Sequence, residues 1–234
     1  MKKVALIVFL VFGAVAFAYL KEQIKAPAAF VPPGYVVVNE VQGDLNGDNR
    51  PDYVFLIKDT DKQKVVKDTD GRERDYNRRG ILVVLSKPDG YALAVDNRGC
   101  FFSEDEEWGV AGPPTLTIWV EKGKLHIDYN HGLNGDWGYT FRYRNGDFEL
   151  IGYDEYFYRD AAYSEQGYTL SRSISINLLT KKAKIVENLN EDPESEEDNL
   201  RETWKKFALR RPITLQDIAN FDEFEPGVLL GLRK

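Results

Sequence analysis

The feature that most constrains the fold is a long series of short, strand-like runs between Tyr35 and Glu187. Each run is rich in β-branched and aromatic residues, and turn residues separate it from the next. The expected strands are Tyr35–Val41, Tyr53–Lys58, Gly80–Ser86, Tyr91–Val95, Thr115–Glu121, Lys124–Tyr129, Gly138–Arg144, Asp147–Tyr153, Tyr168–Ile176 and Ala183–Glu187. Because no helices alternate with these strands, we expect antiparallel pairing. The sequence therefore predicts a mostly-β chain with a single antiparallel β-sheet domain, meander or sandwich-like, over residues 35–187.

The best-specified hairpin turns at Asn145-Gly146. This dipeptide is the preferred two-residue turn because both of its positions adopt positive φ. Counting outward pairs Tyr143 with Phe148 and Phe141 with Leu150, which makes one face apolar, while the other face carries opposite-charge pairs. The turn chemistry and the hydrophobic pattern thus predict the same register.

Two further hairpins are expected. A turn at Lys122-Gly123 places Trp119 opposite His126, and another turn lies near Pro88-Asp89-Gly90. The charge-rich stretch Lys58–Arg79 has almost no apolar residues and is expected to form a long mobile loop or an extended hairpin.

The N-terminus has the pattern of a secretory signal peptide. Two lysines precede an apolar run from Val4 to Phe17, and an A-x-A site ends at Ala18. Cleavage after Ala18 is expected, with an uncleaved membrane anchor as the alternative. Residues 1–18 would then be the signal and residues 19–34, which are rich in Pro and Ala, a flexible tether. This pattern predicts a periplasmic or secreted protein, with no membrane insertion after cleavage.

Residues 188–234 are expected to form an acidic linker followed by C-terminal helices packed on the β domain. Ser195 can cap a helix running from Glu196 to about Leu209. Its apolar residues at helical spacing are Leu200, Trp204 and Phe207. Thr214 with Asp217 resembles a capping box that opens a second, short helix. The fold class thus includes one or two C-terminal helices.

The segment 44–52 has the pattern of a calcium-binding loop. Oxygen-bearing side chains alternate along it, and calcium takes six to eight oxygen ligands. The expected metal ligands are the side chains of Asp44, Asn46, Asp48 and Asp52 and the carbonyl of Arg50. Clustered carboxylates repel one another without a cation, and Gly47 permits the tight curl. The alternative is a plain Asn46-Gly47 turn surrounded by acids.

The loop resembles the first nine positions of an EF-hand or dockerin loop, and it resembles the loops of FG-GAP and VCBS repeats more closely. Phe55 stands where an EF-hand has its last glutamate, inside an apolar run, so no exiting helix is expected. The resemblance implies a structural Ca²⁺ ion that holds the turn between two strands.

No sequence motif indicates catalysis. The two histidines, His126 and His131, lie in no metalloprotease, nucleophile-elbow or nucleotide-binding pattern. A Ser–His–Asp set using Ser103 or Ser164 has no local support. The acidic run Glu104–Glu107 precedes Trp108, and paired carboxylates beside an aromatic ring suit a glycosidase. A hydrolase using these acids is therefore the alternative to a non-enzymatic role.

Charge and cysteine content exclude several classes of protein. The net charge is −7, and removal of Lys2 and Lys3 with the signal makes it −9. Nucleic-acid binding needs clustered basic residues, so it is not expected. The single cysteine, Cys100, allows no intramolecular disulfide and is expected to be a small buried hydrophobe.

Aromatic residues are concentrated between Trp137 and Tyr163. Most of them are expected in the core, but Tyr156, Phe157, Tyr158 and Tyr163 could form an exposed patch that suits sugar or protein binding. Burial of the Tyr153–Tyr163 side chains would weaken this interpretation.

Several segments together resemble a group of uncharacterised exported bacterial proteins. They are Asp44–Asp52, Asn77–Leu82, Tyr139–Tyr143, Asn145–Asp154 and Ser173–Lys182. The resemblance implies a bacterial cell-envelope setting but no activity. The expected function is a calcium-stabilised, exported β module, a non-enzymatic binding or structural protein whose partner is a protein or glycan of the envelope.

Overall fold

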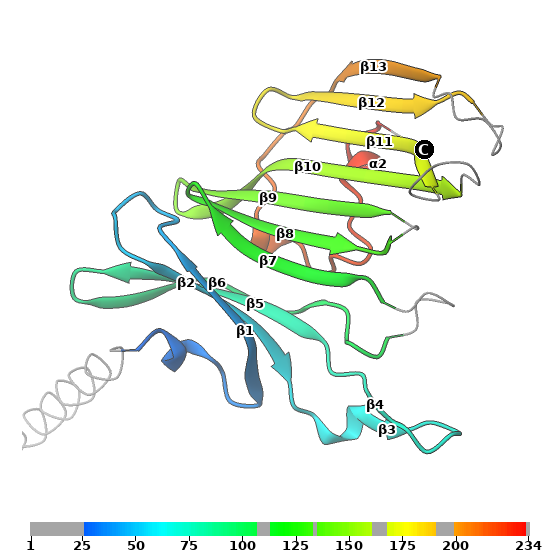
Figure 1. The fold of residues 1–234 in the computed structure, drawn as a ribbon. Helices are drawn as coiled ribbons and strands as arrows, with labels where there is room; N and C mark the ends of the chain where they lie inside the picture. Colours follow the sequence, from blue (N-terminus) through cyan, green and yellow to red (C-terminus); the bar gives the residue numbers. More distant parts are fainter. Residues whose placement is uncertain (1–25, 107–112, 133–134, 161–167, 191–198, 233–234) are drawn as a thin grey trace, which may run out of the picture.

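The computed structural model describes residues 26–106, 113–132, 135–160, 168–190 and 199–232 (Figure 1). The strands are β1 (Tyr35–Gly43), β2 (Asp52–Asp59), β3 (Val65–Lys67), β4 (Glu73–Asp75), β5 (Arg79–Lys87), β6 (Gly90–Phe101), β7 (Thr115–Glu121), β8 (Lys124–Asn130), β9 (Asp136–Arg144), β10 (Asp147–Asp160), β11 (Tyr168–Asn177), β12 (Lys182–Asn188) and β13 (Leu200–Lys206). The short helical turns are η1 (Pro27–Phe30), η2 (Lys62–Lys64), η4 (Leu215–Asp217) and α2 (Pro226–Leu229).

The strands form two main antiparallel sheets. The smaller has the order β1-β2-β5-β6, and the larger is a meander with the order β13-β12-β11-β10-β9-β8-β7. Figure 1 shows the seven strands of the larger sheet stacked from β13 at the top to β7, with the four-stranded sheet below. A separate two-stranded hairpin, β3-β4, projects from the body. The expected mostly-β, antiparallel fold class is confirmed.

The predicted hairpin registers are confirmed. Across Asn145-Gly146, Tyr143 pairs with Phe148 and Phe141 pairs with Leu150. The other two hairpins, β7-β8 and β5-β6, turn where expected. The charge-rich stretch after β2 contains β3 and β4 and is therefore an extended hairpin. These registers follow from short-range turn chemistry, because a two-residue loop determines which residues face each other.

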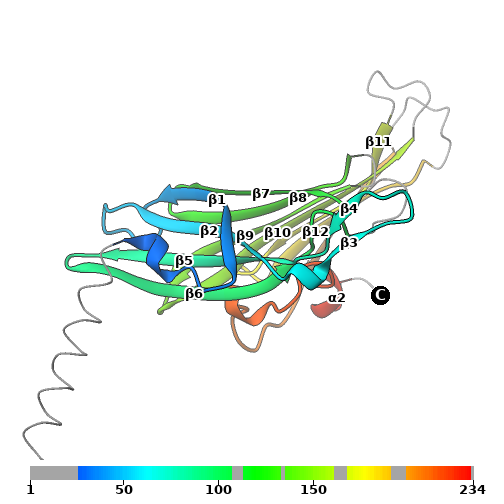
Figure 2. The same cartoon turned by 90° about the horizontal axis from the view of Figure 1, so that it is seen from below.

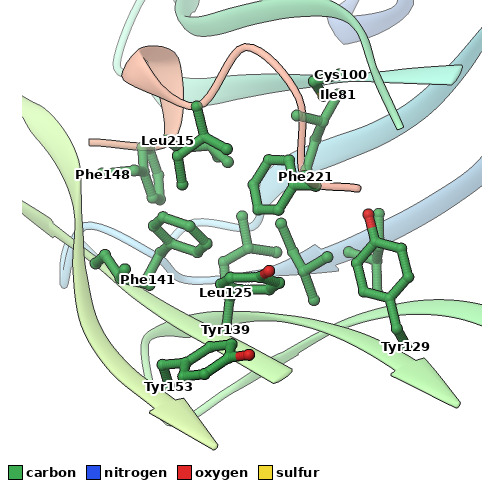
Figure 3. Close-up of a cluster of buried hydrophobic side chains, with 14 of the residues drawn as sticks. Ile81, Cys100, Leu125, Tyr129, Tyr139, Phe141, Phe148, Tyr153, Leu215 and Phe221 are labelled. Atoms are coloured by element: carbon green, nitrogen blue, oxygen red, sulfur yellow. The ribbon is translucent and has the colours of Figure 1, made fainter. Parts of the chain in front are cut away.

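The inner faces of the two main sheets share one hydrophobic core. The buried side chains drawn in Figure 3 include Ile81, Cys100, Leu125, Tyr129, Tyr139, Phe141, Phe148, Tyr153, Leu215 and Phe221. They come from both sheets and from the C-terminal segment. Cys100 is fully buried, as expected for a small hydrophobe.

The C-terminal segment closes this core on one side. Asn97 of β6 donates to the carbonyls of Leu215 and Ile218, and Leu150 of β10 donates to the carbonyl of Ile213. Figure 2 shows the segment, orange to red, on the same side of the large sheet as β5 and β6. The other face of the large sheet is its outer face, the term used below.

The predicted helix over 196–209 is wrong for its described part, because 200–206 form strand β13. The strand pairs antiparallel with β12, so the sheet extends beyond residue 187. Leu200 and Trp204, expected on a buried helical stripe, are 50% and 61% exposed. The local helical spacing is overridden by backbone pairing with a strand that ends 12 residues earlier. The expected capping box of Thr214 and Asp217 is present, but it opens only the single turn η4.

The predicted tether over residues 19–34 is wrong for residues 26–34. Phe30 and Val31, in and just after η1, pack on a small second core formed by Phe55, Ile57, Leu82 and Val84. These residues lie on the face of the small sheet that points away from the main core. The N-terminal turn therefore covers apolar surface that the strands alone would expose to water. The predicted signal peptide, residues 1–18, lies outside the described residues.

Candidate functional site

A hollow of about 320 Å³ lies on the outer face of the large sheet, across β7 to β10. Its lining residues are Trp119, His126, Asp128, Asp136, Trp137, Gly138, Thr140, Asp154 and Tyr156. The ring of Trp137 itself stacks on buried Tyr129 on the inner face. Two larger hollows each carry only one acidic side chain. A smaller hollow of about 190 Å³, beside the C-terminal segment, also has three acids among aromatic rings. The outer-face hollow is therefore the larger of the two that combine aromatic rings with three carboxyl groups.

One side of the hollow is formed by a stacked pair of rings. Trp119 and His126 are directly opposite in the β7-β8 hairpin, with ring centroids 4.8 Å apart and planes within 6° of parallel. The Nδ1 atom of His126 lies 3.3 Å from the hydroxyl of Thr140 on β9. Burial lowers the pKa of His126, so the imidazole is held mainly neutral at pH 7. This side is a rigid, uncharged aromatic surface.

Two carboxyl groups flank a glycine in the centre of the hollow. Gly138 of β9 pairs with Asp128 of β8 on one side and with Asp154 of β10 on the other. A Cβ atom on Gly138 would lie 2.3 Å from Oδ1 of Asp128. The carboxyl group of Asp128 thus lies over the glycine, toward Asp154. Any larger residue at 138 would displace it.

The third acid, Asp136, is held by neighbouring side chains. Its Oδ1 accepts a hydrogen bond from Asn130 at 2.5 Å, and its Oδ2 accepts one from the Tyr158 hydroxyl at 3.2 Å.

Burial, followed by the nearby charges of Asp154 and Asp136, raises the pKa of Asp128 to about 6. The floor of the hollow therefore offers several fixed hydrogen-bond acceptors.

Tyr156 completes the site and is 40% exposed. It lies opposite Asp136, on the same face as Asp154. Tyr153, by contrast, is buried in the core. Tyr163, the last member of the expected aromatic patch, lies outside the described residues. Among the described members of the patch, Phe157 and Tyr158 are half-buried and Tyr156 is exposed.

The acidic loop 44–52 is closed by hydrogen bonds from its own backbone. The carboxylate of Asp44 accepts from the amides of Gly47, Asp48 and Asn49, at 2.7–3.1 Å. The Asn46 side chain accepts from the amide of Asp48 at 3.0 Å. Gly47 and Asn49 both have positive φ, as the curl requires.

The two other acids of the loop have different surroundings. Asp48 forms an ion pair with the guanidinium of Arg50 at 2.7 Å. Asp52 is fully buried and accepts from the amides of Leu45 and Ser86, each at 2.8 Å. Burial, followed by the nearby carboxylates, raises the pKa of Asp52, against the effect of its two donors.

The predicted calcium ligands thus lie along one curled loop, where backbone amides and the Arg50 side chain occupy part of their oxygen atoms. Across the described residues, no three acidic, histidine or cysteine side chains are grouped closely enough to hold a metal ion. A carboxylate has about four acceptor positions, so Asp44 and Asp52 retain some capacity beyond their backbone donors. For Asp48 to act as a ligand, Arg50 would have to move away.

The acids proposed for a hydrolase are paired with arginines. Glu104 lies near Arg79 at 3.6 Å, Asp105 near Arg74 at 3.6 Å, and Glu106 near Arg78 at 3.3 Å. Glu107 and Trp108 lie outside the described residues, as does Ser164. The three described acids therefore neutralise basic side chains, which favours a structural role over a catalytic one.

Compared with models of known protein families, with curated proteins and with solved structures, the chain has no match. In the part of the chain that the structure describes, no helix has the length and apolar character needed to span a bilayer. The candidate site is therefore assigned from its geometry and chemistry in this structure.

Proposed function

We propose that this chain is an exported, non-enzymatic β module of the bacterial cell envelope that binds a glycan in the outer-face hollow. The observation that carries the proposal is the stacked Trp119–His126 pair next to three carboxyl groups. Sugar rings have apolar faces that pack on aromatic rings, and hydroxyl groups that donate to carboxylates. A concave site with a few convergent polar groups is the usual form of a small-ligand site.

The charge of the hollow supports a sugar over a nucleic acid. Asp128, Asp136 and Asp154 would repel phosphate groups, whereas they can accept hydrogen bonds from neutral hydroxyls. Because Asp136 is already held by Asn130 and Tyr158, little side-chain entropy is lost when a ligand binds to it. Export rests on the N-terminal sequence pattern, which predicts cleavage after Ala18 and a periplasmic or secreted product.

A glycan array followed by calorimetry tests this proposal. We expect binding to a neutral or N-acetylated glycan, with at least about tenfold weaker binding by Asp154→Asn, since a carboxylate acceptor is replaced by a weaker amide. The control is Asp89→Asn, which changes an exposed acid in the β5-β6 turn. Absence of binding to every glycan, or an equal loss in the two variants, would overturn the proposal.

A hydrolase is the second candidate, and one observation favours it at this hollow. The pKa of Asp128 is raised to about 6, which suits a general acid, and Asp154 lies on the other side of Gly138 as the second carboxyl group that a glycosidase needs. Prolonged incubation with a bound oligosaccharide would then release new reducing ends, and Asp128→Asn would stop the release. If prolonged incubation of the wild type with the oligosaccharide at pH 5 to 6 releases no new reducing ends, the hydrolase candidate is eliminated.

We also propose that Ca²⁺ stabilises the loop formed by residues 44–52. The ion would be held by side-chain oxygens of Asp44, Asn46, Asp48 and Asp52 and by the Arg50 carbonyl, and it would replace the Arg50 guanidinium at Asp48. At a hundredfold excess over the dissociation constant, binding would add about 2.7 kcal/mol to folding stability. We expect millimolar Ca²⁺ to raise the melting temperature and EDTA to reverse the rise. Identical melts in Ca²⁺, Mg²⁺ and EDTA would refute this proposal.

A further inference from the structure

We infer that the glycan is a linear chain that crosses the strands of the large sheet, from the hollow to Trp204 on β13. This inference rests on the proposed function and names the ligand's shape and a second contact. Three observations support it: the register of the sheet, the exposure and hydrogen bonding of the Trp204 side chain, and the residues between the hollow and Trp204.

A single row of paired residues joins the hollow to Trp204. The row runs Asp128, Gly138, Asp154, Ser175, Lys184, Trp204, one residue on each strand from β8 to β13. Residues directly opposite in adjacent strands point to the same face of a sheet. Trp204 therefore lies on the outer face with the two central acids. With strands about 4.8 Å apart, the Cα atoms of Asp154 and Trp204 are about 14 Å apart along this row.

The indole of Trp204 is exposed and yet held in position. Trp204 is 61% exposed. Among the large hydrophobic side chains in the described part of the chain, only Leu229 is as exposed. The indole N–H donates to Glu202 at 2.5 Å, and Glu202 in turn forms an ion pair with Lys184 at 2.7 Å. Glu202 lies two residues before Trp204 on the same strand and the same face. This hydrogen bond restricts the rotation of the ring. Less side-chain conformational entropy is therefore lost when a ligand packs on it.

The residues between the two ends form a low, polar track. Ser175 is exposed and small, and Lys184 is held by Glu202, so neither blocks the path from Asp154. Hydroxyl and ammonium groups at these positions can exchange hydrogen bonds with sugar hydroxyls. The track therefore suits an elongated ligand with many hydroxyl groups better than a compact one.

A glycan fits this surface better than a polypeptide does. The track crosses β11 and β12, which pair with a strand on both sides, so their backbone groups are already used. An extended peptide gains its affinity by adding to a free sheet edge, not by lying across a face. A glycan needs only side-chain donors, acceptors and rings, which this face supplies.

Length-dependent affinity tests the inference. The probes are the disaccharide and the hexasaccharide of β-1,4-linked N-acetylglucosamine, measured by calorimetry with the full chain. We expect the wild type to bind the hexasaccharide at least about tenfold more tightly, which corresponds to about 1.4 kcal/mol. Trp204→Ala should remove this gain and leave the disaccharide unchanged. Glu202→Ala, which frees the indole, should remove part of the gain.

The control variant is Leu229→Ala, because Leu229 has the same exposed fraction on another part of the surface. It should change neither affinity. Equal binding of both oligomers by the wild type, or an equal loss for both in Trp204→Ala, would overturn the track while the hollow remains a binding site. Failure of both oligomers to bind the wild type would overturn the track, and with it the hollow as a site for this class of glycan.

Discussion

Replacement of Asp52 by alanine should destabilise the protein more than any other change in the acidic loop. The carboxylate is fully buried, and its two oxygens accept from the amides of Leu45 and Ser86. It thereby ties the loop to the end of β5. The alanine variant would leave two backbone N–H groups without acceptors, in a place that water does not reach.

The magnitude follows from these two contacts. A hydrogen bond to a charged acceptor contributes about 1.5–3 kcal/mol, so two contribute about 3–6 kcal/mol. Because burial raises the pKa of Asp52, its ionised form is itself disfavoured in the folded state, which reduces the net gain. We therefore expect Asp52→Ala to lower the free energy of unfolding by about 3 kcal/mol.

Urea unfolding of the full chain measures this effect, in EDTA so that no divalent cation contributes. Asp48→Ala is the matched control, because the Asp48 side chain is partly exposed to solvent and its carboxylate accepts from the amide and the guanidinium of Arg50. Water and salt screen a solvent-exposed ion pair, so Asp48→Ala should show the smaller loss of the two variants. A loss below about 1 kcal/mol for Asp52→Ala, or equal losses in both variants, would refute the reasoning.

Three further predictions concern the hollow and the core. The pKa of Asp128 is raised from 3.8 to about 6, so the folded state binds its proton more tightly than the unfolded state does. The free energy of unfolding should therefore fall by about 1–2 kcal/mol, allowing for solvent screening, as the pH rises from about 4 to about 6. Urea titrations of Asp128→Asn should lack this fall, and its persistence would contradict the assignment. Gly138→Ala should push the Asp128 carboxyl group out of the hollow and return its NMR-measured pKa toward 3.8; an unchanged value would count against the close approach. Phe221→Ala should cost about 3–5 kcal/mol in urea unfolding because Phe221 is 1% exposed in the core, whereas Leu229→Ala should stay within about 0.5 kcal/mol. Similar losses for these two variants would refute the role of Phe221.

The strands and hairpins could be predicted because their signals are local. Asn145-Gly146 and Lys122-Gly123 adopt positive φ at both turn positions, and the pairing of their flanking strands follows by counting. The prediction of a helix after residue 195 was wrong because the structure of this segment depends on a partner distant in the sequence. Leu200 and Trp204 have helical spacing, but β12 offers a complete row of backbone partners, and nothing local indicates this.

The candidate site was only partly visible in the sequence. The pairing of Trp119 with His126 was expected, but Asp154 and Tyr156 were not placed beside it. Continued counting from the Asn145-Gly146 turn would put Asp154 opposite Trp137, on the core face. The register shifts by one residue between Leu150 and Gly152, and Asp154 instead pairs with Gly138 on the outer face. One extra residue in a strand moves every later side chain to the other face.

The sequence by itself determined the mostly-β character, the hairpins and a curled acidic loop, since each depends on residues close together in the chain. The tertiary structure decided which acids share a surface. The irregularity in β10 is stabilised by distant partners: the Leu150 N–H donates to the carbonyl of Ile213, and the Leu178 N–H donates to the carbonyl of Ile151. Because those partners come from the turn after β11 and from the C-terminal segment, the site on the outer face exists only once the whole sheet has assembled.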